Sequence, residues 1–162
     1  MFIIIITLLF LIFLIFRPCA ASYRTRSGRR YRARDRKTAE IIDVLRDISI
    51  HLTYNINPED GELLRERLQN TSFKELIYQD PQIMGWNYDK GREIGIKIYT
   101  SSGSMYTAND IISTLLHELA HSLTQIHGHD QPWIEKDEYL QTFKQKYVDI
   151  FILKTSYLSN NE

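Results

Sequence analysis

Residues 107–123 read TANDIISTLLHELAHSL, the pattern of a helix that is buried on most of its faces. Thr107, followed by Asp110 three residues later, is typical of a helix start, where a side chain binds a free backbone N–H group. Apolar residues recur along the stretch at helical spacing: Ile111, Leu115, Leu119 and Leu123, with Ile112, Leu116 and Ala120 beside them. We therefore predict a core helix in this region.

The polar residues His117, Glu118 and His121 lie near the end of this predicted helix. Two histidines four residues apart share one face, so both imidazoles can reach a single metal ion. Glu118 is rotated by about 100° from His117 and points beside that ion. Zinc lowers the pKa of a bound water towards 7, and a neighbouring carboxylate can accept its proton. The motif predicts zinc-dependent hydrolysis; two structural histidines beside an unpaired, buried glutamate would be a costly alternative.

A hydrolytic zinc site also needs a third protein ligand and one open position. In one group of enzymes with this motif the third histidine stands at the position of His127, and a glycine makes the turn where this chain has Thr124. Because Gly128 is the only glycine nearby, we predict that the helix continues through Ile126 and that the turn brings His129 to the metal. The alternatives are His127, Glu135 and Glu138.

The motif resembles that of WLM-type and SprT-like zinc metallopeptidases, most closely the small membrane-anchored members from large DNA viruses. The shared pattern is HELAH, a short spacer, Gly128-His129, and then the large aromatic residue Trp133, which begins a final helix. The resemblance covers roughly residues 38–147. It implies a zincin-like fold, a protein or peptide substrate, Zn²⁺ as cofactor, and the following site residues: ligands His117, His121 and His129, and general base Glu118. The additional histidine at position 127 departs from the pattern.

The N-terminal residues 1–16 form an apolar run without a charge. As a helix it would span about 24 Å, slightly less than a hydrocarbon core of about 30 Å. A cleaved signal peptide ending at the small residues 19–21 is the alternative. Basic residues follow the run and none precedes it, which favours an uncleaved anchor. We predict a single-pass protein of a host or virion membrane, with its C-terminal domain in the cytosol.

Residues 17–37 contain nine of the 20 Lys and Arg residues and one acidic residue, Asp35, although the formal net charge of the whole chain is zero. This composition predicts a disordered basic linker. Beside a membrane such a linker would bind anionic headgroups. A nucleic acid is a second, less favoured partner, because Tyr23 and Tyr31 could stack on bases.

Residues 38–162 have the size of one domain. Apolar periodicity and turn residues predict these elements: a helix at 38–54, a turn at 57–61 before a short helix, a loop or helical turn at 73–77, strands at 86–88 and 94–98 joined by a loop at 89–92, and a helical stripe of Leu140, Phe143, Tyr147 and Phe151. The resemblance to zinc peptidases implies that the strand at 94–98 offers a sheet edge to an extended substrate; the alternative is that its isoleucines only form the inward face of a small sheet. Asp130 could orient a histidine or cap the next helix, and Tyr106 and Tyr139 are candidate oxyanion donors.

Together these patterns predict an α+β, zincin-like domain with a metal-binding core helix, a small sheet or hairpin and flanking helices, behind an N-terminal transmembrane helix. The predicted domains are an anchor (1–16), a linker (17–37) and a zinc metallopeptidase-like domain (38–162). The rival function is a non-catalytic, membrane-anchored structural or binding protein that is stabilised by zinc, for example in a viral particle.

Overall fold

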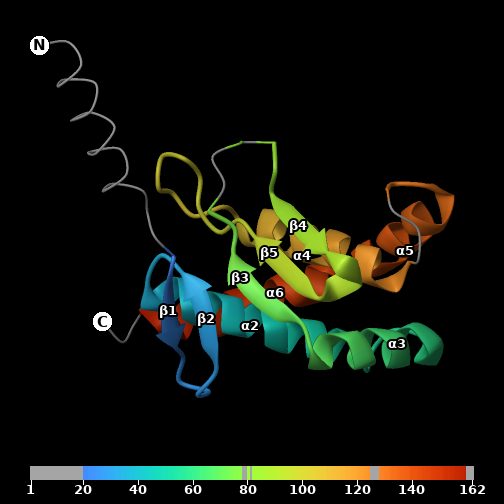
Figure 1. Ribbon diagram of the computed structural model, residues 1–162, viewed down its shortest axis with the longest axis horizontal. Coiled ribbons are helices and arrows are strands. Elements are labelled where there is room, and N and C mark those ends of the chain that lie inside the picture. Colours follow the sequence, from blue (N-terminus) through green and yellow to red (C-terminus); the bar gives the residue numbers. More distant parts are fainter. Residues whose placement is uncertain (1–19, 78–79, 81, 125–127, 160–162) are drawn as a thin grey trace, which may run out of the picture.

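A mixed sheet with the strand order β1-β2-β3-β5-β4 organises the fold (Figure 1). The computed structural model describes residues 20–77, 80, 82–124 and 128–159. Its elements are β1 (Ala21–Arg24), β2 (Arg30–Ala33), α2 (Arg36–Leu52), α3 (Pro58–Gln69), β3 (Ser72–Glu75), β4 (Gly85–Tyr88), the 3-10 helix η1 (Asp89–Gly91), β5 (Glu93–Ile96), α4 (Ala108–Leu123), α5 (Gln131–Gln141) and α6 (Lys144–Ser159). The predicted α+β class is confirmed.

The helices α2, α4 and α6 lie behind the sheet in Figure 1, which leaves the opposite face of β1, β2 and β3 towards the viewer. α2 packs against β2 and β3, α4 packs against β4 and β5, and α6 lies across both helices. The apolar stripes predicted from the sequence form the core between these layers, with the following residues fully or almost fully buried: Ile42, Leu45, Phe73, Ile94, Ile96, Leu115, Leu119, Tyr147 and Phe151.

The segment 17–37 was predicted to be a disordered linker, and from Ala21 onward that prediction is wrong. β1 and β2 form an antiparallel hairpin, and β2 joins the sheet through parallel pairing of Arg32 with Lys74 of β3. The folded part of the chain therefore begins before residue 38, the predicted domain boundary.

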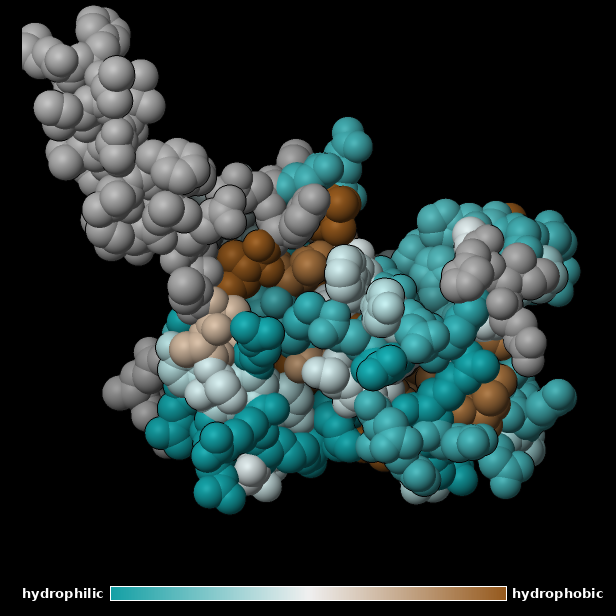
Figure 2. Space-filling view, viewed as in Figure 1, coloured by the Kyte–Doolittle hydropathy of each residue, from teal (hydrophilic) through white to brown (hydrophobic). Residues whose placement is uncertain are grey.

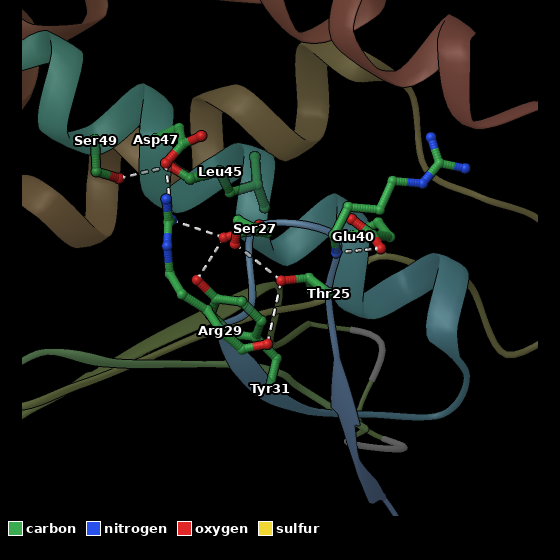
Figure 3. A network of polar contacts seen from close by, with 10 residues as sticks. Thr25, Ser27, Arg29, Tyr31, Glu40, Leu45, Asp47 and Ser49 are labelled. Atoms are coloured by element: carbon green, nitrogen blue, oxygen red, sulfur yellow. Dashed lines mark hydrogen bonds and ion pairs between the residues drawn. The ribbon is translucent and has the colours of Figure 1, made fainter.

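The hairpin is ordered because carboxylates of α2 neutralise part of its charge. Arg29 Nη1 lies 2.8 Å from Asp47 Oδ1 (Figure 3). The same nitrogen lies 2.7 Å from Asp43 Oδ1. The hydroxyl of Tyr31 donates to the same Asp43 oxygen at 2.8 Å, and burial together with this carboxylate raises the pKa of Tyr31 to about 12. Because Tyr31 is buried and Tyr23 packs against the core, the two rings predicted to stack on bases face inward.

Replacing Asp43 by Ala should lower the free energy of unfolding by about 2–3 kcal/mol, because it leaves the buried hydroxyl of Tyr31 unpaired and removes one partner of Arg29. Asp47→Ala is the matched control. Its side chain is 39% exposed, so we expect a loss below about 1 kcal/mol. Urea denaturation measures both values, and equal losses would show that Asp43 is not the anchor of the hairpin.

The predicted membrane anchor, residues 1–16, lies outside the described residues. In the part of the chain that the structure describes, no helix is both long and apolar enough to cross a bilayer. On this finding, the prediction of a single-pass membrane protein with a cytosolic C-terminal domain is corrected.

Several local predictions were also wrong. The predicted turn at 57–61 is the start of α3, since the Asn57 side chain accepts from Asp60 N at 2.9 Å and Pro58 occupies the first turn. The segment predicted as a loop around Phe73 is β3, which pairs in parallel with strands on both sides. The last apolar stripe was predicted as one helical stripe, but it is divided between α5 and α6. The chain turns between these helices, where the backbone N–H of Thr142 donates to Tyr139 O.

The predicted hairpin at residues 86–98 is confirmed as β4, η1 and β5. Its loop holds three consecutive residues with positive φ, ending at Gly91 with φ of 97°. β5 is paired with β3 and β4, so it offers no free edge, and its neighbour β4 lies at the edge of the sheet instead.

Candidate metal centre

The core helix α4 begins where the sequence predicts, with Thr107 Oγ1 accepting a bond from Asp110 N at 3.1 Å. It ends earlier than predicted, at Leu123. Thr124 takes an extended conformation (φ −111°, ψ 152°), which a β-branched residue adopts readily and which stops the helical hydrogen bonds. The prediction that the helix continues through Ile126 is therefore wrong, and residues 125–127 lie outside the described residues.

Three imidazoles meet beside this helix end. The ring centroids of His117, His121 and His129 are 5.1–5.2 Å apart, and one nitrogen of each ring lies within 4.8 Å of the other two. Three nitrogens that bind one zinc ion tetrahedrally at about 2.0–2.1 Å lie about 3.4 Å from one another, so the rings would move closer together to bind one ion. His127 lies outside the described residues, and Glu135 and Glu138 are not in the cluster.

The indole of Trp133 closes one side of the histidine cluster. Its ring centroid lies 4.7, 5.0 and 4.3 Å from those of His117, His121 and His129, and the residue is buried. Asp130 occupies the N-cap position of α5 but makes no side-chain capping bond. Its Oδ1 atom and Trp133 Nε1 are buried without a hydrogen-bond partner among the described residues. Two unpaired polar atoms thus lie in the segment that follows His129.

The pKa values of His117 and His121 favour the neutral imidazoles that a metal cation needs as ligands. Burial lowers the pKa of His117, and burial followed by the other two imidazoles lowers the pKa of His121 to about 4. Both rings are neutral at pH 7 and keep a lone pair for a metal, as histidine ligands require. A donor set of three imidazoles fits zinc.

Glu118 lies beside the cluster and is 5% exposed. Burial, followed by the nearby carboxylate of Asp137, raises the pKa of Glu118 to about 8. A cation bound by the histidines would favour the ionised form of this carboxylate. The site thus holds a buried acid whose charge depends on the metal.

Two residues of the edge strand β4 hold α4 close to the sheet. Asn87 Nδ2 donates to Glu118 O at 2.6 Å and to Ser122 Oγ at 2.7 Å, while Gly91 N donates to Asn87 Oδ1 at 2.7 Å. Gly85 leaves room for the Glu118 carboxyl group, because a Cβ atom at this position would lie 2.5 Å from Glu118 Oε1. No local sequence pattern predicts this role of β4, because the contacts join residues about 30 positions apart.

Clefts of about 670 Å³ and 390 Å³ adjoin the cluster, and Gly85, His117 and Glu118 line both of them. Asp137 lines the larger cleft, where Gln141 Nε2 donates to its Oδ1 at 3.2 Å. Asp137 was not among the predicted site residues, although its position four residues after Trp133 places both on one face of α5. The candidate oxyanion donor Tyr139 instead accepts a bond from the backbone N–H of Asn57 at the start of α3.

The second candidate oxyanion donor, Tyr106, packs against the core as a half-buried residue and is absent from the lining of both clefts.

In the metal-free protein, Glu118→Gln should increase stability at alkaline pH. The pKa of Glu118 rises from 4.5 to about 8 on folding, so its contribution to stability is complete below about pH 4.5 and is lost as the pH rises through 8. The amide does not titrate, and we expect the variant to exceed the wild type by up to a few kcal/mol near pH 8. Urea denaturation of chelator-treated proteins between pH 5 and about 8.5 measures this difference. Parallel stability curves for the two proteins would contradict it.

Comparison with known proteins gives one family and two crystal structures. The WLM domain family matches residues 63–151, which include the three histidines and Glu118. A mutant of Wss1 from Saccharomyces cerevisiae is 21% identical, with 56% of this chain and 85% of that chain covered and a TM-score of 0.42. A second Wss1 structure is also 21% identical, with 54% and 76% covered and the same TM-score. No curated protein matches.

Proposed function

Because the chain belongs to the WLM domain family, we propose that it is a zinc-dependent metallopeptidase that hydrolyses peptide bonds. In this proposal His117, His121 and His129 hold the zinc ion, and Glu118 is the general base. The observation that carries it is the convergence of three imidazoles beside a buried carboxylate, between two open clefts. The same arrangement fits a protein or peptide substrate, which can approach along β4.

The residues of the chain would act as follows. A bound zinc ion supplies Lewis acidity, which polarises the scissile carbonyl and makes a water molecule more acidic. Glu118 accepts a proton from the attacking water and can return it to the leaving amine. Trp133 excludes solvent from one side of the histidines, and Asn87 and Gly85 hold the Glu118 segment against the edge strand. The outer edge of β4 is paired with no described strand, so it can pair with an extended peptide through backbone hydrogen bonds.

Gly85→Ala tests whether β4 sets the position of the base. The added methyl group would lie 2.5 Å from Glu118 Oε1 and 2.6 Å from Thr114 Cγ2, so the carboxyl group or the strand must move. Because a misplaced catalytic group costs about 10²-fold in rate, we expect kcat to fall by about this factor while zinc stays bound.

The control for this variant is Gly103→Ala. Apart from its chain neighbours, no described residue has an atom within 4 Å of the added methyl group, although the φ of 85° will cost some stability. It should leave kcat unchanged at a temperature where the fold is intact. Wild-type kcat in Gly85→Ala would show that Glu118 is not positioned by this strand.

The rival function is a zinc-stabilised structural or binding protein without turnover. A structural site does not need an open position or a carboxylate beside the metal, and burying Glu118 is costly in the metal-free state. These features favour the peptidase.

The test uses the full chain with an unfolded protein substrate, before and after removal of metal by a chelator. We expect one zinc per chain by elemental analysis, cleavage that disappears with the metal, and recovery on addition of zinc. Stoichiometric zinc without cleavage of folded or unfolded proteins would favour the structural role.

A further inference from the structure

Positive side chains line up on the face of the sheet that the helices leave free. The strand register places Arg32 of β2 opposite Lys74 of β3, and Lys74 in line with Gly95 and Trp86 on the far strands. Arg30 precedes Arg32 by two residues and shares its face. Figure 2 shows the hydrophilic surface over β1 and β2. We call Arg24, Arg30, Arg32 and Lys74 the basic row.

The pairs within this row carry like charges. Arg24 lies directly opposite Arg30, and Arg32 lies directly opposite Lys74. Like charges at directly opposite positions of a sheet repel each other and destabilise it. The repulsion within these two successive pairs lowers the stability of the sheet, and a bound anionic partner would offset that repulsion.

Little within the protein neutralises the row. Lys74 Nζ forms an ion pair with Glu93 at 2.6 Å. Arg24, Arg30 and Arg32 are exposed and form no ion pair with any described residue. By contrast Arg29, from the same hairpin, points to the carboxylates of α2.

The basic row leads to the candidate metal centre. Trp86 and Tyr88 lie on the same face as the row and also line the cleft that contains His121 and His129. The strand β2 is three strand spacings from β4, about 14 Å, which an extended peptide spans with four to five residues. A polypeptide held in the cleft can therefore reach the row.

The aromatic side chains on this face are engaged within the protein. Trp86 lies under Lys74 Nζ at 5.0 Å, stacks with Tyr88 at 6.3 Å, and donates from Nε1 to Glu93 Oε1 at 3.2 Å. Among the described residues, no aromatic ring is exposed beside Arg24, Arg30 and Arg32, since Tyr23 and Tyr31 face inward. The row therefore suits carboxylates, which arginine binds with two parallel bonds, better than stacked bases.

We propose that the basic row docks an acidic segment of the substrate polypeptide while the peptide bond to be cleaved lies at the metal centre. This proposal rests on the proposed peptidase function and adds a substrate preference to it. Acidic residues about five positions from the cleaved bond should lower KM, and the effect should weaken with salt, because exposed charges are screened.

The experiment uses the full chain carrying Glu118→Gln, so that binding is measured without turnover. Two fluorescent peptides share one sequence, except that a run of glutamates in the first is a run of glutamines in the second. Fluorescence anisotropy measures Kd for each peptide against the parent protein, Arg30→Gln/Arg32→Gln, and the control Arg26→Gln/Arg36→Gln. The control removes the same charge from exposed positions outside the row.

We expect the parent to prefer the glutamate peptide, and the row variant to bind it about 5- to 10-fold more weakly, as two lost surface ion pairs imply. The control should bind like the parent.

Equal weakening in both double variants, or no preference for glutamate, would overturn the proposal. Tighter binding of a single-stranded oligonucleotide that depends on Arg30 and Arg32 would assign the row to nucleic acid and also overturn it. Because binding is read without cleavage, inactivity of the wild type would count only against the peptidase function.

Discussion

Replacing Glu118 by Gln should lower kcat by about 10²–10⁴-fold, the usual contribution of a general base. The amide keeps the size and shape of the side chain, so the close approach to Gly85 is preserved. It cannot accept the proton of the attacking water. The bond from Asn87 goes to the backbone oxygen of Glu118 and does not involve its side chain. The three histidines are unchanged in this variant, so zinc should remain bound at one ion per chain.

The control for this prediction is Glu135→Gln, which removes one carboxylate from an exposed position on α5 outside the cluster. Its kcat should equal that of the wild type. Zinc analysis and rate measurement on the same samples separate loss of the base from loss of the metal. Wild-type cleavage by Glu118→Gln would show that another group takes the proton, and Asp137, which lines the same cleft, would be the next residue to replace.

The parts of the site that lie within one helix could be predicted from the sequence. The start of α4 at Thr107, its apolar faces and the placing of His117 and His121 on one face all follow from helical periodicity. The β4–β5 hairpin was predictable for a similar reason, since alternation and a glycine loop are local signals.

The parts that depend on distant partners were not predictable in this way. The charge of the hairpin at residues 21–33 indicated disorder, because the carboxylates that stabilise it, Asp43 and Asp47, belong to α2. β3 has four residues and is paired on both sides, so it shows too little alternation to be recognised. Gly85 and Asp137 reach Glu118 only through the packing of β4 and α5 on α4. Local patterns thus predict elements, and the contacts between them complete the site.

The identity of the third ligand gives the second large effect. His129→Ala should weaken zinc binding by more than about 100-fold, beyond what loss of a supporting hydrogen bond to a ligand causes. The reason is geometric, since the His129 ring lies 5.1–5.2 Å from those of His117 and His121, and Gly128 before it has a φ of 114°, which turns the chain there.

The comparison variants for this prediction are His127→Ala and His51→Ala. His51 lies on α2 and contacts Tyr147, so its loss should leave zinc affinity unchanged. We expect His127→Ala to change the affinity by less than about 10-fold, which is below the effect of losing a ligand or its supporting hydrogen bond. Competition with a chromogenic chelator gives all three values, and the melting temperature with saturating zinc reports the same order, because binding to the folded state stabilises it. If His127→Ala lost zinc while His129→Ala retained it, the third ligand would be His127, and the turn at Gly128 would serve only to direct the chain into α5.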